Sequence, residues 1–309
     1  MINKGDAIRM AAGTVGLLLV FLLVYHFYQK QNPAEQLAFK ASRVDLVSRM
    51  RIALASASEA EKSAVLAITD QESLTFADQA RAAASEVERE RRELEDLLKT
   101  GGSQTEKDLF KQFTEFFDEY KRVDHELLNL AVKNTNIKAY NLAFGPATDA
   151  VNEMCAAFSR LTASKHGSPE ENEIILLTDR IQIAALHIQT LIPLHIAEES
   201  DKKMDELEVR MGTDDDQIRK NLVSLTALPT LNRNADLVTA TSCYARFSKI
   251  QAQILELSRE NTNVRSLSIS LNQKRKVMLL CQNTLDELQQ AILAEPISGV
   301  TYGRPAKPR

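Results

Sequence analysis

The sequence predicts an all-α protein with an N-terminal transmembrane helix followed by two tandem antiparallel four-helix bundles. The first observation is that 309 residues include only 10 Gly and 8 Pro, which leaves few turns and disfavours β-sandwiches, barrels and propellers. The second is an uncharged apolar run near the N-terminus. The third is a pattern of helically spaced apolar residues that recurs along the chain at a fixed offset.

The first element is the uncharged run at residues 10–29, which as a helix spans about 30 Å, the thickness of a bilayer core. No small-residue cleavage site follows the run, so we expect an uncleaved anchor at residues 1–30 rather than a signal peptide. Lys4 and Arg9 precede it and favour an N-terminus inside the cytoplasmic membrane, although several basic residues also follow it. The chain is therefore expected to cross the membrane once, with its bulk outside the cytoplasm.

A second apolar stretch, residues 181–197, contains no Asp, Glu, Lys or Arg. It is short for a membrane span and includes the polar residues Gln182 and His187 as well as Pro193. This length and polarity predict a buried helix of a bundle.

Long heptad-like stripes of apolar residues occupy much of the remaining chain and resemble coiled-coil patterns. Ser103 and Glu106 predict one helix start, and Ser168 followed by Pro169 predicts another. About eight helices are expected after the anchor. The predicted breaks fall near residues 69–72, 99–103, 144–146, 165–168, 212–216, 228–234 and 271–272.

An internal repeat organises these helices. Residues 131–138 (AVKNTNIK) recur at 258–265 (SRENTNVR), an offset of 127 that also matches apolar positions on both sides. Each copy is long enough for a four-helix bundle with its own core. The repeat predicts bundle 1 at residues 31–166, bundle 2 at 167–296 and a flexible basic tail at 297–309.

Residues 59–73 (EAEKSAVLAITDQES) and the two Asn-Thr-Asn helices carry a family resemblance. Placed after a membrane helix, they resemble the four-helix-bundle sensory (ligand-binding) domain of methyl-accepting chemotaxis proteins, here in two copies. The resemblance implies a periplasmic signal-transduction module at the bacterial inner membrane. The sequence contains no second span and no methylated signalling hairpin, so we expect the signal to pass through a partner protein.

Composition and motifs exclude several functions. The chain has 42 acidic and 38 basic residues, which argues against nucleic acid as a partner. It has no GxSxG, P-loop, HExxH or GxGxxG motif, so we expect neither an enzyme nor a cofactor.

The repeated asparagines are the most informative polar feature. Asn134 and Asn261 fall on apolar stripes, and a cation follows each by one turn. One interpretation is a polar pocket in which the amides orient a ligand and the cations hold its anionic group. The other is a pair of buried amides that set helix register, which we favour because both copies keep them. The candidate ligand-binding residues are Asn134, Asn136, Lys138, Asn261, Asn263 and Arg265.

Other candidates have simpler explanations. His187 and His195 lie on one predicted helix and are possible metal ligands, but their spacing favours two partly buried histidines. Cys243 and Cys281 lie on neighbouring predicted helices, where a disulfide is the alternative to two free core thiols. Glu90 occupies a core-type position and can pair with a cation on a neighbouring helix.

Two functions follow from this sequence. The first is a membrane-anchored, chemoreceptor-like sensory or ligand-binding module that acts through partner proteins. The alternative is a structural or scaffolding subunit that docks on a membrane protein complex. The expected partners are the lipid bilayer, other membrane or signalling proteins, a small-molecule ligand and, in a homodimer, a second copy of the chain.

Overall fold

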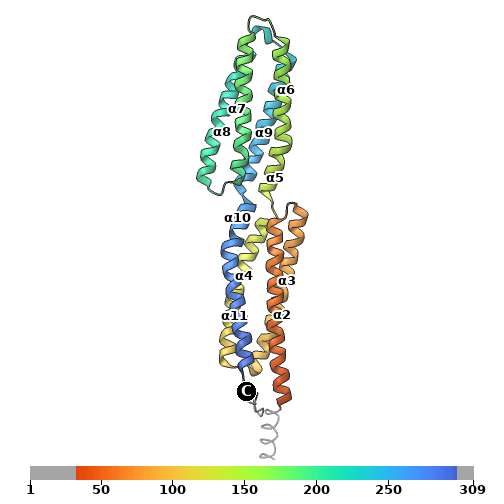
Figure 1. Cartoon of the computed structure of the whole chain (residues 1–309), viewed down its shortest axis with the longest axis vertical. Helices are drawn as coiled ribbons and strands as arrows, with labels where there is room; N and C mark the ends of the chain where they lie inside the picture. The colour runs from red at the N-terminus through yellow and green to blue at the C-terminus, as the bar shows by residue number, and fades with distance from the viewer. Residues whose placement is uncertain (1–32, 298–309) are drawn as a thin grey trace, which may run out of the picture. The chain divides into compact units, whose positions relative to one another are not determined.

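A computed structural model describes residues 33–297, which are coloured in Figure 1. These residues form helices joined by short turns and include no strand, so the all-α prediction is confirmed for the described part of the chain. The candidate anchor at residues 10–29 lies outside the described residues, as does the predicted tail beyond residue 297. The α-helices are α2 (Pro33–Leu66), α3 (Asp70–Gly101), α4 (Gln104–Ala131), α5 (Thr135–Leu142), α6 (Thr148–Ser164), α7 (Glu171–Ala197), α8 (Asp201–Ala227), α9 (Ala235–Glu260), α10 (Thr262–Ile269) and α11 (Arg275–Ala294).

The described chain divides into two compact units, neither of which is continuous in sequence. Unit 1 contains residues 33–57, Ala82–Glu119 and 277–297, and unit 2 contains Ser58–Arg81 and Tyr120–Lys276. The predicted boundary between residues 166 and 167 does not separate these units, because both residues lie in unit 2.

Unit 1 is a set of four helical segments from α2, α3, α4 and α11. Arg43 of α2 is buried and forms ion pairs with Glu106 at the start of α4 and with Glu295 just after α11. The Lys40 ammonium donates to the carbonyl of Leu293, 2.6 Å away. Ser103 accepts a hydrogen bond from the backbone of Glu106, as its predicted capping role requires. Ion pairs and hydrogen bonds therefore hold α2 against the end of α11.

Glu90 of α3 pairs across unit 1, as its core-type position predicts. Its carboxylate is buried and lies 3.9 Å from the guanidinium of Arg49 on α2. Burial raises the pKa of Glu90, and the positive charge of Arg49 partly offsets that effect.

Unit 2 buries a continuous apolar core between α5, α6, α7, α8 and α9. In Figure 1, α7 lies beside α8, and α6 lies beside α9. Arg160 on α6 pairs with Asp236 on α9 at 2.8 Å, and Glu153 pairs with Arg246 at 2.6 Å. Helices predicted to belong to separate bundles thus pack together, and the prediction of sequential bundles is corrected. The reason is that amphipathic periodicity marks which face of a helix is buried but not which helix covers it.

Two predicted breaks are continuous helix instead. Residues 144–146 lie in the π-helical segment η1 (Ala143–Ala147), and residues 271–272 lie in the π-helical segment η3 (Ser270–Lys274). Pro146 is tolerated because the wider turns of a π-helix already interrupt the regular hydrogen-bond ladder. The two segments lie 127 residues apart, so the repeat extends to this irregularity of the backbone.

The predicted break at residues 212–216 is also helical, because α8 continues through it. Asp214 bonds to His187 on α7 and Asp215 bonds to Arg219 one turn later. These contacts hold the segment in place and offset the weak helix propensity of Gly212.

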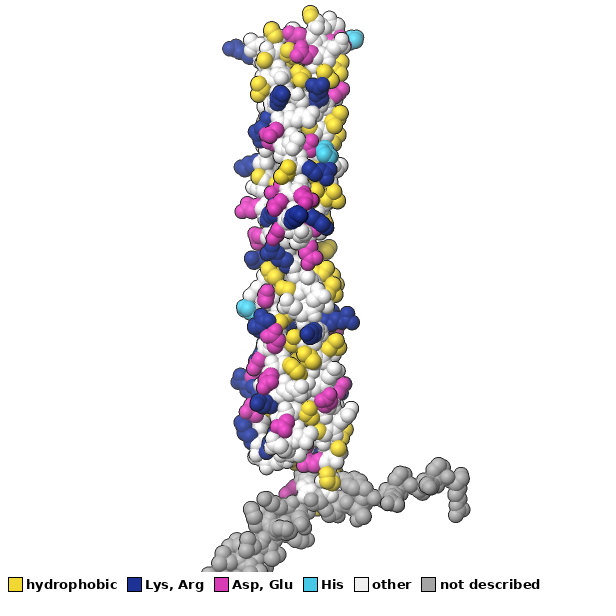
Figure 2. All heavy atoms as spheres, turned by 90° about the vertical axis from the view of Figure 1, so that its left-hand side faces the viewer, with side chains coloured by type: hydrophobic (Ala, Val, Ile, Leu, Met, Phe, Trp, Pro, Cys, Tyr) yellow, Lys and Arg dark blue, Asp and Glu magenta, His cyan; other side chains and the backbone are white. Residues whose placement is uncertain are grey.

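Helix α7 contains the second apolar stretch and packs against α5, α6, α8 and α9, as expected for a bundle helix. Among the described residues it is the helix with the length and hydropathy to cross a membrane, yet 44% of its most apolar window is buried in the protein. Other apolar side chains of α7 face solvent, and Ile183 is 67% exposed. Elsewhere the surface mixes acidic and basic side chains, as Figure 2 shows for one face.

Candidate functional site

The two repeated asparagines lie in unit 2 at positions where one helix ends and the next begins. Asn134 precedes α5 with φ 50° and ψ 39°, and Asn261 lies between α9 and α10 with φ 52° and ψ 38°. Both are left-handed conformations, which Asn tolerates better than most residues. The sequence places an asparagine where each chain segment turns from one helix into the next.

The two Asn-Thr-Asn elements bond directly to each other. The backbone N–H of Thr135 donates to Thr262 Oγ1 at 3.2 Å, and the N–H of Thr262 donates to Thr135 Oγ1 at 3.1 Å. Asn136 and Asn263 exchange an equivalent pair of bonds between backbone N–H and side-chain oxygen. The contacts are reciprocal, so the two copies are related by a local two-fold arrangement.

The side-chain amides of this junction are also satisfied. Asn136 Nδ2 donates to Asn261 Oδ1 at 2.7 Å and to the carbonyl of Ile196 at 2.7 Å. Asn263 Nδ2 donates to Asn134 Oδ1 at 2.9 Å. These bonds explain how strongly polar side chains remain buried at this position.

Each repeat asparagine further bonds to the end of a neighbouring helical hairpin. Asn261 Nδ2 donates to the carbonyl of Glu198, and Asn134 Nδ2 donates to the carboxylate of Asp70. Lys138 pairs with the same carboxylate at 3.0 Å and lowers the pKa of Asp70. Arg265, the corresponding cation of the second copy, is exposed. The junction therefore engages its asparagines in protein contacts, and this geometry supports the register interpretation.

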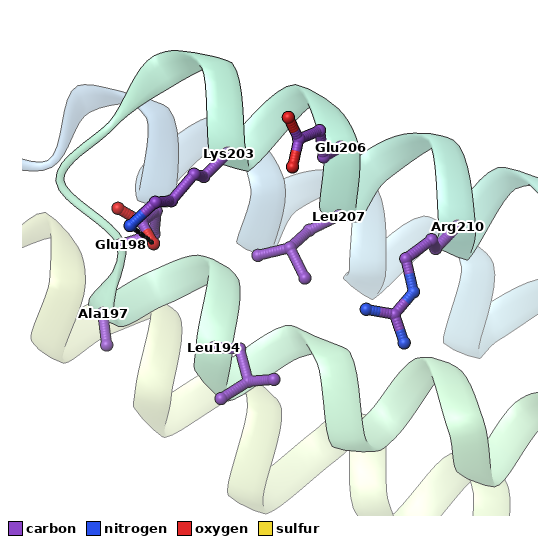
Figure 3. A pocket seen from close by; sticks show the side chains of 7 residues that line it. All are labelled: Leu194, Ala197, Glu198, Lys203, Glu206, Leu207 and Arg210. Carbon is purple, nitrogen blue, oxygen red and sulfur yellow. Dashed lines mark ion pairs between the residues drawn. The ribbon is translucent and has the colours of Figure 1, made fainter.

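A pocket of about 450 Å³ lies between the C-terminal part of α7 and the N-terminal part of α8. Its lining residues are Leu194, Ala197, Glu198, Lys203, Glu206, Leu207 and Arg210. Figure 3 shows Leu207 and Arg210 pointing from α8 toward α7, with Leu194 on the facing helix α7. The pocket thus combines an apolar wall with charged groups along one edge.

The two cations that line the pocket, Lys203 and Arg210, differ in whether a carboxylate neutralises them. Lys203 lies 3.7 Å from Glu198, which neutralises it. Arg210 has no carboxylate within ion-pair distance among the described residues, and its Nη2 lies 3.5 Å from His187 Nε2. His187 is held in turn by Asp214 at 2.7 Å. Arg210 is therefore an oriented cation available to an anionic group.

His195 lies at the end of α7 and is fully buried. Its Nε2 is 2.8 Å from Glu208 Oε1, and its Nδ1 is 2.8 Å from Ser258 Oγ. Burial lowers the pKa of His195, whereas the hydrogen bond from Arg259 is the main cause that lowers the pKa of Glu208. In the neutral form, Nε2–H donates to Glu208, while Ser258 Oγ donates to the backbone carbonyl of His195 at 3.0 Å.

The candidate metal ligands His187 and His195 are not brought together. Each bonds to its own carboxylate, and His187 is half exposed whereas His195 is buried. Within residues 33–297, no group of three or more His, Cys, Asp or Glu side chains is arranged to hold a metal ion. The three cysteines are free thiols, and burial raises the pKa of Cys155 and Cys243.

Sequence reasoning missed Arg210, Lys203 and Leu207. They are ordinary residues of an amphipathic helix and belong to no motif. The available signal was their spacing, because Lys203 and Arg210 lie two turns apart with Leu207 between them. Using that signal requires knowing that α7 and α8 form a hairpin.

No protein-family model matches the sequence, and a comparison with functionally described proteins found no match.

Proposed function

We propose that this chain is a membrane-anchored sensory module of the extracytoplasmic space that binds a small ligand and acts through a partner protein. The observation that carries the proposal is the α7–α8 pocket with its unneutralised guanidinium. Its volume of about 450 Å³ suits a small organic molecule. The uncharged run at residues 10–29 supports the anchor, and the resemblance to chemoreceptor sensory domains supports the role in signalling.

The lining of the pocket selects a ligand class. Arg210 suits a carboxylate, because its planar fork donates two parallel hydrogen bonds. Leu194 and Leu207 suit an apolar body of a few carbons. A small carboxylate with an aliphatic or aromatic body is therefore the expected ligand.

Thermal unfolding of the full chain with hexanoate and benzoate tests this function. A ligand at 100 times its Kd stabilises the folded protein by about 2.7 kcal/mol, so the melting temperature rises. Arg210→Gln should remove the rise, whereas the control Lys220→Gln, at an exposed position on the same helix, should keep it. If the wild type does not respond, or if Arg210→Gln responds like the wild type, the proposal is wrong.

A second candidate function is docking on a membrane protein complex, and the exposed apolar side chains of α7 favour it. Ile183 and Leu194 are 67% and 57% exposed, and Leu176 and Leu186 accompany them on the same helix. Site-specific photo-crosslinking in intact cells, from position 183 and from control position 238 on α9, distinguishes the two functions. A single discrete adduct from position 183 alone supports docking, and its absence supports the sensory module.

A further inference from the structure

A cluster of ionisable side chains lies inside unit 2, away from the α7–α8 pocket. Lys274, the last residue of η3, is 1% exposed and its ammonium pairs with the carboxylate of Asp124 on α4. The ammonium also lies 3.2 Å from the centre of the Tyr120 ring and 3.4 Å from the Tyr120 carbonyl. Asp124, the Tyr120 ring and the Tyr120 carbonyl thus all hold the ammonium of Lys274.

Glu61 of α2 completes the cluster and is 1% exposed. Ser270, the first residue of η3, and Lys274, the last residue, both lower the pKa of Glu61, the first through its side-chain hydroxyl and the second through its charge. The Oε1 atom of Glu61 has no hydrogen-bond partner among the described residues. The carboxyl group of Glu61 therefore interacts with the first and the last residue of the π-helical segment η3.

The internal repeat shows that the fold does not require these charges. At the equivalent positions of the other copy, Lys274 corresponds to Ala147, Ser270 to Ala143 and Asp124 to Gln251. In the first helix of each copy the offset is 128, so Glu61 corresponds to Gln189, and η1 is nevertheless π-helical. Because buried charges are costly and replaceable by neutral residues, their presence in one copy alone indicates a role beyond packing.

The charge balance of the cluster depends on a single proton. Lys274 and Asp124 neutralise each other, so an ionised Glu61 adds an unbalanced negative charge in a buried site. Burial accordingly raises the pKa of Glu61, against smaller opposing effects of Ser270, Lys274 and Lys62. Asp124 raises it further.

We propose that Glu61 is a proton-binding site whose occupancy selects the conformation of the π-helical segment Ser270–Lys274. With the proton bound, Glu61 is neutral and Lys274 stays with Asp124. When the proton leaves to water, the new carboxylate competes with Asp124 for the ammonium of Lys274 and strengthens its bond with Ser270. Both ends of η3 are then pulled toward α2, and the segment responds to external pH.

The direction of the pH effect follows from the raised pKa. The unfolded chain binds fewer protons than the folded one between the ordinary pKa of Glu and the raised value. The stabilising effect of the proton is therefore complete below the unfolded pKa and is lost as pH rises through the folded pKa. Each pH unit between the two values changes the folding equilibrium about tenfold.

Amide hydrogen exchange at residues 270–274 of the full chain, from about pH 5 to about pH 9 and corrected for intrinsic exchange, tests the proposal. Wild-type protection should fall with rising pH, by up to about tenfold per unit, while Glu61→Gln should keep its protection at every pH. The control Glu90→Gln removes a buried carboxyl of unit 1 and should leave the exchange of η3 pH-dependent. Flat wild-type exchange, or an unchanged pH dependence in Glu61→Gln, overturns the proposal.

Infrared difference spectra of the wild type and of Glu61→Gln across the same pH range observe the proton directly. A protonated carboxyl band that disappears with rising pH in the wild type and is missing from Glu61→Gln supports the proposal, and identical spectra of the two proteins overturn it. These readouts are independent of the α7–α8 pocket, so failure here leaves the ligand test unaffected.

Discussion

At the scale of single residues, Asn134 and Asn261 combine a backbone role with a side-chain role. Their positive φ angles turn the chain from one helix into the next, and their amides bond across the repeat. The sequence identified these residues as buried polar positions. It did not predict the left-handed backbone or the reciprocal bonds, because helical periodicity describes burial and not pairing.

The asparagine junction predicts that Asn261→Leu destabilises the protein. Leu in the left-handed region costs about 1–2 kcal/mol, and each buried group left without its partner costs about 1–3 kcal/mol, so we expect a loss of at least about 2 kcal/mol. Urea unfolding measures it. Asn261→Gly adopts the same backbone freely, so it should lose only the amide contribution and be the more stable variant. A Leu variant as stable as the wild type contradicts this account.

At the scale of elements, two glycines illustrate two different effects. One concerns the helix propensity of glycine, and the other concerns the backbone dihedral angles that glycine allows. Gly212 lies inside α8, and Gly167 lies in the turn before α7 with φ 77°. A Cβ atom added at either position meets no atom within 4 Å. The sequence prediction of a break at residues 212–216 failed because the contacts of α8 with its neighbours outweigh the propensity of one glycine.

This pair of glycines predicts opposite effects of one substitution. Gly212→Ala should stabilise the protein by about 1 kcal/mol, because alanine is the better residue in an exposed helix interior. Gly167→Ala should destabilise it by about 1–2 kcal/mol, because its φ is unfavourable for any residue with a Cβ. Thermal melting of the two variants measures both effects, and the same sign for both would show that steric space and not backbone geometry decides.

At the scale of the whole molecule, helices that lie far apart in the sequence pack against each other. The sequence had instead predicted two bundles, each built from consecutive helices. In unit 1, α2 is fastened to α11, and in unit 2, α6 is fastened to α9. The sequence was sufficient for the helical class and for the turns near residues 69, 101, 165 and 228, but not for the turns after residues 131, 197 and 260. It was not sufficient for the choice of partner helices, because stripes of Leu, Ala and Phe fit many neighbours equally well.

The interleaved pairing predicts that a cut between the sequence halves does not separate them. A specific protease site inserted in the turn at residues 166–170, before α7, should give two fragments on a denaturing gel. Native mass spectrometry should still find one complex, because α6 and α9, as well as α2 and α11, then lie on different fragments. Separation of the fragments without denaturant would instead support sequential bundles.

The reciprocal bonds between Thr135 and Thr262 have a consequence for ancestry. An interface in which the same residues of two copies face each other is what a symmetric dimer forms. A chain with one copy of the element has the donors and acceptors to make these bonds with a second molecule, so we expect the repeat to descend from such a dimer by gene duplication. The difference between Lys274 and Ala147 is then a divergence between the two copies.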